Sequence, residues 1–438
     1  MKHVLCLGAG LVARPYIDYL LKKGYQVTVA SRTVSKAERM INGRSNGTPV
    51  AFDIQREPER LKDLVAPVDL VTSLLPYTHH VTVATECLRQ SKHMTTTSYV
   101  SDGMRALDAK AKKEGVILLN ECGVDPGLDH MSAMKVIHEA QANGGTIRSF
   151  TSFCGGLPAP DANNNPFGYK LSWSPRGVLL AGTNSARFIK DGKEVVIPSE
   201  ELFNSCHEEE VPGLGTFEGY PNRDSTPYVD IYGVKETKTM LRGTLRYLGW
   251  CATIYDFGRM GLLDLTEQDF TGKTYEGFVR ELVKAPSGVD TRAAVAKFLK
   301  RDEQHNVLER FNWLGLFDDR RIPLERSTAL DVVCTLFEEK LQYAPGERDM
   351  LVMQHKFEIE YAGGRKERVR STLIDYGIPH GDTSMSRTVA YPVAIASRLI
   401  LEGEISLTGV QIPIIPEIYE SILAEIAEFD IRFKEETF

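Results

Sequence analysis

Through residue 120, short apolar runs alternate with longer segments whose apolar residues recur at helical spacing. The apolar runs, at 2–7, 26–30, 49–53, 68–75, 92–97 and 116–120, predict buried parallel strands. The segments between them, at 11–23, 34–42, 57–64, 80–90 and 104–113, predict helices. This alternation of strand and helix indicates an α/β domain with a doubly wound parallel sheet.

The pattern changes from Thr146 onward. Residues 146–154 alternate like a half-buried strand, and the glycines and prolines at 155–160 predict its end. Further strands are expected at 194–197, 229–234 and 237–242, and segments 351–361 and 366–374 predict a hairpin around Gly363-Gly364. Helical periodicity dominates 250–345, and 388–401 predicts a final helix. We therefore expect a second α/β domain on a mixed sheet, with a helical insertion.

A glycine turn directly follows the first predicted strand. The sequence Gly8-Ala9-Gly10-Leu11-Val12-Ala13 has the form G-x-G-x-x-A and leads into a helix. In such a turn the first glycine allows a tight bend, the second lets the backbone approach a pyrophosphate, and the small Ala13 lets the helix lie against the strand. The helix N-terminus faces the phosphate charge. A plain glycine turn is the alternative, but this context predicts a dinucleotide-binding domain of the Rossmann type.

The end of the second strand indicates which dinucleotide binds. NAD sites carry Asp or Glu there, whereas this chain has Ser31-Arg32-Thr33. The planar fork of Arg32 matches a phosphate, and the flanking hydroxyls add donors. A solvated arginine in a surface turn is the other interpretation. We expect NADP(H) as the cofactor.

These patterns divide the chain into regions. We expect an NADP-binding domain at 1–124, a substrate and dimerisation domain at 125–250 and 345–387, and a helical subdomain at 251–344. The C-terminal segment 388–438 is expected to pack back on the first domain. Asp53, at the end of the third strand, has two interpretations of equal standing: a partner for the adenine amino group, or a structural carboxylate that caps a helix or a turn.

Composition narrows the class of protein. The 438 residues, with 42% hydrophobic and 25% charged content, are typical of a soluble globular protein. A net charge of −7 and the lack of Lys/Arg-rich runs argue against nucleic-acid binding, and no apolar run is long enough to span a membrane. Seven scattered cysteines suit free thiols in a reducing cytoplasm and offer no metal cluster. The first strand begins at once, which leaves no room for a secretion signal.

Several longer sequence blocks carry a resemblance that spans nearly the whole chain. They are Thr96-Thr97-Ser98-Tyr99, residues 120–130, Cys154-Gly155-Gly156-Leu157-Pro158-Ala159-Pro160, residues 165–177, residues 220–225, residues 242–247, Glu347-Arg348-Asp349 and residues 354–358. With these blocks the sequence resembles the glutamate-forming, NADP-linked saccharopine dehydrogenases, or saccharopine reductases, of the aminoadipate route to lysine. Residues 181–185 and 411–438 match less closely, which bears on the fine selectivity of the pocket.

The resemblance implies a reaction, a location and an assembly. Saccharopine would be oxidised at the carbon of a secondary amine, and the imine hydrolysed to L-glutamate and 2-aminoadipate 6-semialdehyde. A cytoplasmic homodimer with an α/β substrate domain is expected. The cofactor residues it implies, together with the glycine turn, are Gly8, Ala9, Gly10, Leu11, Val12, Ala13, Ser31, Arg32, Thr33, Phe52, Asp53, Leu74, Thr96, Thr97, Val124, Asp125, Leu128, Met131 and Ser174. For the substrate it points to Ser98, Tyr99, Arg223, Thr244, Leu245 and Arg246.

A substrate with several carboxylates requires fixed cations, and proton transfer requires a titratable group. Arg223 and Arg246 suit carboxylate clamps, with a surface ion pair, such as Arg223 with Asp224, as the alternative. Asp125, Tyr99 and Cys154 are the candidates for proton transfer, and all three are also candidate substrate contacts. Each has a structural alternative: Asp125 as a turn or helix cap, Tyr99 as a stacking or hydrogen-bonding group, and Cys154 as a small buried residue.

Other conspicuous residues receive structural interpretations. His79-His80 is expected to be a loop pair at a helix start and no metal site, and Glu208-Glu209-Glu210 a solvated turn. His130 is expected to be helical, and Trp173 to line the substrate pocket or to serve as a core or hinge aromatic residue.

Three other functions compete with the saccharopine dehydrogenase. A reductase of carboxylated polyamines would need fewer carboxylate clamps, so Arg223 and Arg246 argue against it. A non-catalytic NADPH-binding regulatory protein would bind the nucleotide without turnover. A purely structural module is hard to reconcile with the many polar blocks at loop positions.

Overall fold

The computed structural model describes residues 1–438 and divides into two compact units. The first unit comprises residues 1–145 and 371–436, and the second comprises residues 146–370 and 437–438. These limits differ from the expected ones, because residues 125–145 and 371–387 belong to the first unit. The helix α7 (Leu128–Ala142) packs there against α16 (Pro416–Ile426), a helix that the sequence did not predict.

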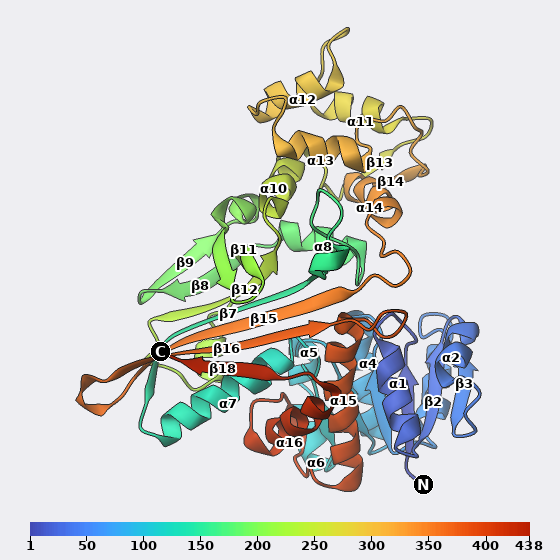
Figure 1. Ribbon diagram of the computed structural model, residues 1–438. Coiled ribbons are helices and arrows are strands. Elements are labelled where there is room, and N and C mark those ends of the chain that lie inside the picture. The colour runs from blue at the N-terminus through green and yellow to red at the C-terminus, as the bar shows by residue number, and fades with distance from the viewer. The chain divides into compact units, whose positions relative to one another are not determined.

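The first unit is built on seven parallel strands (Figure 1). Their order is β17 (Gly409–Gln411), β6 (Ile117–Leu119), β5 (His93–Thr96), β4 (Leu70–Ser73), β1 (His3–Leu7), β2 (Gln26–Ser31) and β3 (Gly47–Ala51). Strand β1 pairs with β2 on one side and β4 on the other. The strand order therefore reverses beside β1, which is where ligands bind in sheets of this kind. The predicted doubly wound α/β fold is confirmed.

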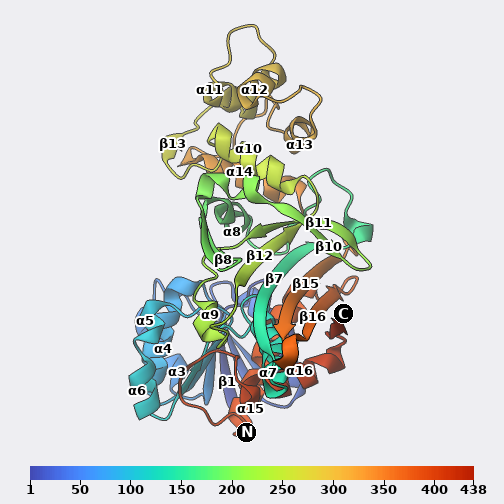
Figure 2. The same ribbon diagram turned by 90° about the vertical axis from the view of Figure 1, so that its left-hand side faces the viewer.

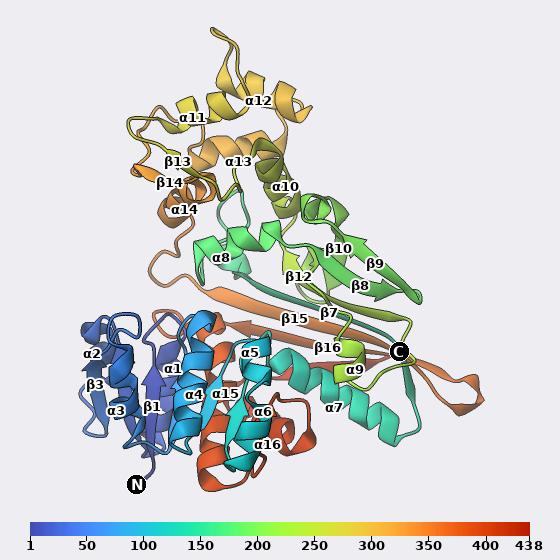
Figure 3. The ribbon, with the colours of Figure 1, turned by 180° about the vertical axis from the view of Figure 1, so that it is seen from behind.

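Helices cover both faces of this sheet. On one face α3 (Leu61–Val65), α4 (His80–Arg89), α5 (Asp102–Arg105) and α6 (Asp108–Lys113) bury Val65, Val83 and Leu88 against Leu5, Val71 and other strand residues (Figure 3). The other face carries α1 (Ala13–Lys22) and α15 (Ser384–Glu402), and α2 (Val34–Ile41) packs beside α1. Residues 104–113, expected as one helix, form the end of α5 and α6, with the break at 106–107.

The second unit has a mixed sheet built on long strands (Figure 2). At its centre β7 (Thr146–Pro158) pairs in parallel with β12 (Thr239–Arg246) and antiparallel with β15 (Asp349–Glu360). Beyond β12 follow β11 (Gly215–Pro221) and β10 (His207–Val211), and the hairpin of β8 (Ala186–Lys190) and β9 (Lys193–Ile197) joins at β12. The division between the two units falls within two strands. β16 (Lys366–Tyr376) belongs to the second unit up to Arg370 and to the first from Ser371, and all of β18 (Phe433–Thr437) except Thr437 belongs to the first.

Two strand predictions in this unit are wrong. The glycine pair at 155–156 does not end β7, which continues to Pro158, because Gly155 lets β12 approach; a Cβ there would lie 2.7 Å from the Leu245 carbonyl oxygen. Residues 229–234, expected as a strand, contain most of the short helix α9 (Tyr228–Ile231). The triplet Glu208-Glu209-Glu210 is not a solvated turn but part of β10, with Glu209 buried.

The predicted helical insertion is present within the second unit. It contains α10 (Trp250–Met260), α11 (Tyr275–Leu282), α12 (Thr291–Leu299), α13 (Asn306–Leu314) and α14 (Ala329–Lys340), with the short pair β13 (Glu267–Asp269) and β14 (Arg326–Thr328). A further helix, α8 (Pro175–Leu180), packs on α14. The core of the helical insertion is aromatic: the centroid of the Phe257 ring lies 5.1 Å from that of Phe311 and 6.3 Å from that of Phe337. No helix of the molecule combines the length and apolar composition needed to cross a membrane.

Candidate functional site

The glycine turn of the first unit has the geometry that a dinucleotide requires. Gly8 has φ +113°, and a Cβ there would lie 2.9 Å from the Leu74 carbonyl oxygen, so only glycine fits. Gly10 has no atom within 4 Å of its would-be Cβ, which leaves its backbone open to a ligand. Ala13 is fully buried where α1 begins, whereas Leu11 is 73% exposed. The turn thus offers free amide groups at a helix N-terminus, where phosphate oxygens bind.

Basic side chains surround a hollow of about 480 Å³ beside this turn. Ala9, Gly10 and Leu11 line it together with Arg14, Lys36 and Arg39. Arg14 is neutralised by Asp382, with its Nε 2.9 Å from the carboxylate. The remaining positive charge of Lys36 and Arg39 suits phosphate groups.

The end of β2 carries no acidic residue. Arg32 and Thr33 are exposed, Ser31 is half-buried, and Ser31 Oγ accepts a long hydrogen bond of 3.4 Å from the Thr33 amide. The Arg32 guanidinium has no ion pair within the protein, which leaves its donor fork available to a 2′-phosphate.

Two other predicted cofactor residues have clear structural duties. Asp53 accepts a 3.0 Å hydrogen bond from the Gln55 amide, which is the turn role considered for it, and its carboxylate lies 3.7 Å from Arg56. The Phe52 ring is 4% exposed and belongs to the core of the first unit. Leu74, the residue whose carbonyl oxygen faces Gly8, is half-buried.

The carboxyl ends of β4 and β5 meet in a network of hydroxyl groups around His80. Thr96 Oγ1 donates to the Ser73 carbonyl oxygen at 2.9 Å, and Ser98 Oγ lies 2.8 Å from His80 Nε2. His80 begins α4, at the start of the helix predicted for 80–90; it is 4% exposed, and burial lowers its pKa to about 4. Its position directly before the apolar residues of the predicted helix was the sequence signal for this burial. The side chain of Thr97, the residue after Thr96, packs against Gly123.

The segment after β6 folds back across the end of β5. The Glu121 amide donates to the Ser98 carbonyl oxygen at 3.0 Å, and the Cys122 amide donates to that of Thr96 at 3.2 Å. At Gly127, φ is +149° and a Cβ would lie 2.0 Å from the Gly123 carbonyl oxygen, so this tight turn also requires glycine. Beyond it, the side chains of Leu128 and Met131 are fully buried and that of Val124 is 6% exposed. A cofactor would therefore meet the main chain of this turn more than these apolar side chains.

Two of the three proton-transfer candidates lie together in the first unit. The Tyr99 hydroxyl donates to Asp125 Oδ1 at 3.2 Å. The peptide bond from Asp125 to Pro126 is cis. The two residues come from different loops, one after β5 and one after β6, so the fold joins groups 26 positions apart.

A buried acid–histidine cluster supports both of these loops. His130 is fully buried in α7, with Nε2 2.8 Å from Glu121 Oε2 and Nδ1 3.6 Å from Asp129 Oδ2. Glu121 also accepts from the Val100 amide at 2.9 Å, and Asp129 accepts from the Gly127 amide at 2.5 Å. Glu121 thus holds the loop that carries Tyr99, a role that its position after a strand did not reveal.

The second unit carries the other predicted residues on β7 and β12. Cys154 of β7 is 9% exposed and stands opposite Thr244 of β12 in the parallel register. Leu245 is fully buried and packs on Gly155, so its part in the site is structural.

Arg246, the last residue of β12, is an unusual buried cation. It is 5% exposed, and its guanidinium lies 5.1 Å from the Tyr169 ring and 5.5 Å from the Trp250 ring. Its Nη1 donates to the Leu245 carbonyl oxygen at 2.8 Å, and its Nε has no hydrogen-bond partner. No carboxylate is paired with the guanidinium. Because a buried charge is costly unless it is paired, this guanidinium is suited to an anionic ligand.

The surroundings of Arg223 differ from those of Arg246. Arg223 is exposed in a turn with φ +56°, and its carbonyl oxygen accepts from the Arg187 amide at 2.9 Å. Asp224 instead accepts from the Thr226 amide at 2.8 Å and faces Arg187 at 3.7 Å.

Ser174 and Trp173 lie at the start of α8. Ser174 Oγ caps this helix by accepting from the Gly177 amide at 3.3 Å. Trp173 is 39% exposed, so it is not a core residue, and a Cβ on Gly177 would lie 2.5 Å from its ring.

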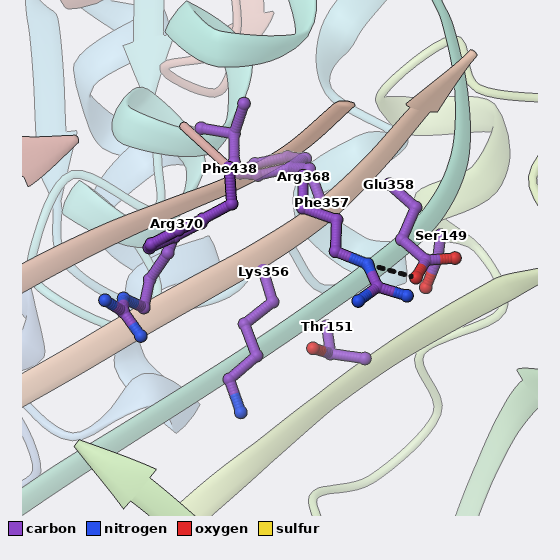
Figure 4. A pocket seen from close by; sticks show the side chains of 9 residues that line it. Ser149, Thr151, Lys356, Phe357, Glu358, Arg368, Arg370 and Phe438 are labelled. Carbon is purple, nitrogen blue, oxygen red and sulfur yellow. Dashed lines mark hydrogen bonds and ion pairs between the residues drawn. The ribbon is translucent and has the colours of Figure 1, made fainter. Parts of the chain in front are cut away.

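Another hollow, of about 360 Å³, lies in the second unit and is lined by three basic side chains, Lys356, Arg368 and Arg370 (Figure 4). Arg368 pairs with Glu358 at 3.1 Å, Lys356 pairs with Glu209, and the Arg370 guanidinium lies 4.9 Å from the Phe438 ring. Since Arg368 and Lys356 already have acidic partners, this hollow does not resemble the setting of Arg246. No group of three or more His, Cys, Asp or Glu side chains is arranged to hold a metal ion.

The residues of the first unit fit the phosphates of a dinucleotide. Gly8 occupies a place where any side chain would collide, Gly10 leaves the backbone open, and Arg32 has no ion pair. When bound, a nicotinamide dinucleotide supplies or accepts a hydride.

Comparison with known proteins gives matches along the whole chain. Residues 4–119 match the model of the saccharopine dehydrogenase NADP binding domain, and residues 123–431 match that of the saccharopine dehydrogenase C-terminal domain. A saccharopine dehydrogenase [NADP(+), L-glutamate-forming] of Schizosaccharomyces pombe is 42% identical over 100% of this chain and 99% of its own. The enzyme of the same name from Saccharomyces cerevisiae is 41% identical over 100% and 99%.

More distant relatives match this chain over only part of their own length. The mitochondrial alpha-aminoadipic semialdehyde synthase of Bos taurus is 37% identical over 99% of this chain but only 47% of its own length. Among solved structures, the apo saccharopine dehydrogenase (L-Glu forming) of Saccharomyces cerevisiae superposes with a TM-score of 0.92 at 39% identity, over the full length of both chains. The chain therefore belongs to the saccharopine dehydrogenase family.

Proposed function

We propose that the chain is an NADP-dependent, L-glutamate-forming saccharopine dehydrogenase. It would interconvert saccharopine, NADP⁺ and water with L-glutamate, 2-aminoadipate 6-semialdehyde and NADPH, a reaction of the aminoadipate route to lysine. The observation that carries the proposal is Arg246, a buried guanidinium without a carboxylate partner, in a chain whose first unit has an open glycine turn and an unpaired Arg32.

In this proposal the two arginines of the second unit recognise the substrate. Arg246 binds one carboxylate of saccharopine with its planar fork, and the Tyr169 and Trp250 rings keep the guanidinium in place. Arg223 binds a second carboxylate at a more exposed position. Ser98 in the first unit and Thr244 in the second add hydroxyl donors. A carboxylated polyamine, with fewer acidic groups, would leave one of these cations unused.

In the same proposal Asp125 is the group that transfers protons. As hydride leaves the carbon beside the secondary amine, the amine proton is lost and a C=N bond forms. Water then adds to this imine, and the carbinolamine breaks its C–N bond as the glutamate nitrogen takes up a proton. Asp125, held by the Tyr99 hydroxyl at 3.2 Å, is the first candidate to accept and return these protons. Cys154 is the alternative in the second unit.

The test is direct. Purified protein is mixed with NADP⁺ and saccharopine, and the absorbance of the reduced cofactor and the release of glutamate are followed together. We expect both to rise in equal amounts, with little reaction when NAD⁺ replaces NADP⁺. Tight NADP⁺ binding without turnover of any secondary amine would contradict the proposal and favour a regulatory nucleotide-binding protein.

We also propose a cytoplasmic homodimer, with dimer contacts made by the α/β region that carries β7, β12 and β15. All seven cysteines are free thiols, which suits a reducing compartment. Light scattering of the purified protein at several concentrations measures its mass, and a single monomer mass throughout would contradict the dimer.

A further inference from the structure

His80 is a buried titratable group that the proposed reaction does not use. Its ring lies between two hydroxyl groups, with Nδ1 2.9 Å from Ser73 Oγ and Nε2 2.8 Å from Ser98 Oγ. Nε2 also lies 3.2 Å from Thr96 Oγ1. Because burial lowers its pKa to about 4, the ring is neutral near pH 7 and has one donor and one acceptor nitrogen.

The surrounding hydrogen bonds determine which nitrogen carries the proton. Thr96 donates its hydroxyl hydrogen to the Ser73 carbonyl oxygen at 2.9 Å, so it can only accept from His80. Ser73 is fully buried, and Nδ1 is the one acceptor within reach of its hydroxyl hydrogen. A proton on Nδ1 would leave that hydrogen without an acceptor and would set a lone pair of Nε2 against Thr96. Since buried polar groups in proteins are almost always hydrogen-bonded, the proton belongs on Nε2.

The consequence reaches Ser98, which is half-buried and has no other side-chain partner. If Nε2–H donates to Ser98 Oγ, the hydroxyl hydrogen of Ser98 is not used within the protein. We propose that His80 is a positioning residue, which holds the Ser98 oxygen so that its hydrogen is donated to a carboxylate of the bound substrate. This inference rests on the proposed function, in which Ser98 contacts saccharopine.

Two substitutions separate the two sides of the ring. In His80→Gln the amide nitrogen takes the place of Nε2 and can still donate to Ser98, whereas in His80→Asn it takes the place of Nδ1 and cannot reach Ser98. We expect His80→Asn to raise the KM for saccharopine about tenfold with kcat changed less than about threefold, and His80→Gln to stay within about threefold of wild type. The matched control is His79→Asn, because His79 is the preceding residue and makes no side-chain hydrogen bond; it should match wild type.

A double-mutant cycle tests whether His80 acts through Ser98. The variant Ser98→Ala should raise KM as much as His80→Asn does, and the double variant should be no worse than Ser98→Ala alone. Additive effects, equal losses in His80→Gln and His80→Asn, or a changed NADPH affinity would overturn the inference and indicate a merely structural role. If wild type does not turn over saccharopine at all, the proposed function fails instead.

A spectroscopic measurement on the wild type does not depend on turnover. Nitrogen NMR of protein labelled at histidine should show His80 near pH 7 as the neutral tautomer protonated at Nε2, with its signal assigned by difference from His80→Gln. Protonation at Nδ1, or a charged ring, would overturn the inference even if the enzyme is active.

Discussion

Arg32 in the first unit and Arg246 in the second are both assigned to anionic groups, but their settings are opposite. Arg32 is exposed at the end of β2 and has no ion pair, whereas Arg246 is 5% exposed at the end of β12 and lies over two aromatic rings. An exposed charge is already solvated, so a ligand gains only a screened interaction of about 0–1 kcal/mol from it. A buried charge costs several kcal/mol to desolvate, and a bound anion offsets that cost. The second unit should therefore control whether the substrate binds, while the first controls which dinucleotide is preferred.

The largest expected effect comes from removal of the buried cation. Because the loss of one partner of a buried pair costs about 3–5 kcal/mol, Arg246→Met should lower kcat/KM for saccharopine by at least about 100-fold. Steady-state kinetics measures this, and calorimetry should show unchanged NADP⁺ affinity. The control is Arg326→Met, which removes an exposed arginine of the same unit that pairs with Glu267 at 3.2 Å. Equal kinetics for the two variants would remove the distinction between buried and exposed arginines.

The next effect locates the proton-transfer group in one of the two units. Asp125→Asn should lower kcat about 100-fold, because general acid–base catalysis contributes about 10²–10⁴-fold. Tyr99→Phe should cost several-fold less, since the Tyr99 hydroxyl only supports the carboxylate at 3.2 Å. Cys154→Ser provides the matched test in the second unit. pH–rate profiles of the three variants decide between them, and a large loss in Cys154→Ser alone would move proton transfer to the second unit.

A smaller effect is expected at the exposed arginine. In Arg32→Glu a carboxylate replaces the proposed phosphate partner, so the KM for NADP⁺ should rise about ten- to fiftyfold while that for NAD⁺ falls. The ratio of kcat/KM for the two cofactors measures the change, and its dependence on salt should weaken in the variant. An unchanged ratio would show that the end of β2 does not select the dinucleotide.

The smallest effects separate two glycines of one turn. Gly8→Ala should lower the free energy of unfolding by about 1–2 kcal/mol, because φ is +113° and the new Cβ would lie 2.9 Å from the Leu74 carbonyl oxygen. Gly10→Ala should leave stability within about 0.5 kcal/mol, since no atom lies within 4 Å, yet weaken NADP⁺ binding several-fold. Urea unfolding and calorimetry measure the two quantities. Equal loss of stability in both variants would contradict the structural distinction.

The functional edge of the first unit was predictable because it depends on local patterns. Each strand of the parallel sheet is followed by a helix, so the strand ends share one edge. Gly8 and Ser31 could be placed there from spacing, whereas Thr96 was implied by the family resemblance. The second unit was less predictable. Its sheet pairs β7 with β12 and β15 over long sequence separations, and the glycines that looked like a strand end instead allow β12 to approach β7. The strand prediction for residues 229–234 was wrong for a related reason: their apolar side chains suit a short buried helix as well as a strand.

By itself the sequence determined the doubly wound fold, the dinucleotide turn and the family, since these rest on periodicity and on motifs contiguous along the chain. Only the tertiary structure decided which polar groups are buried and with what partners: that Arg246 lacks a carboxylate, that Tyr99 reaches Asp125, and that His80 lies between Ser73 and Ser98. The physical reason is that a side chain's solvation and hydrogen bonds depend on neighbours that are distant in sequence. A residue type states what chemistry is available, and the packing around it selects which part of that chemistry is used.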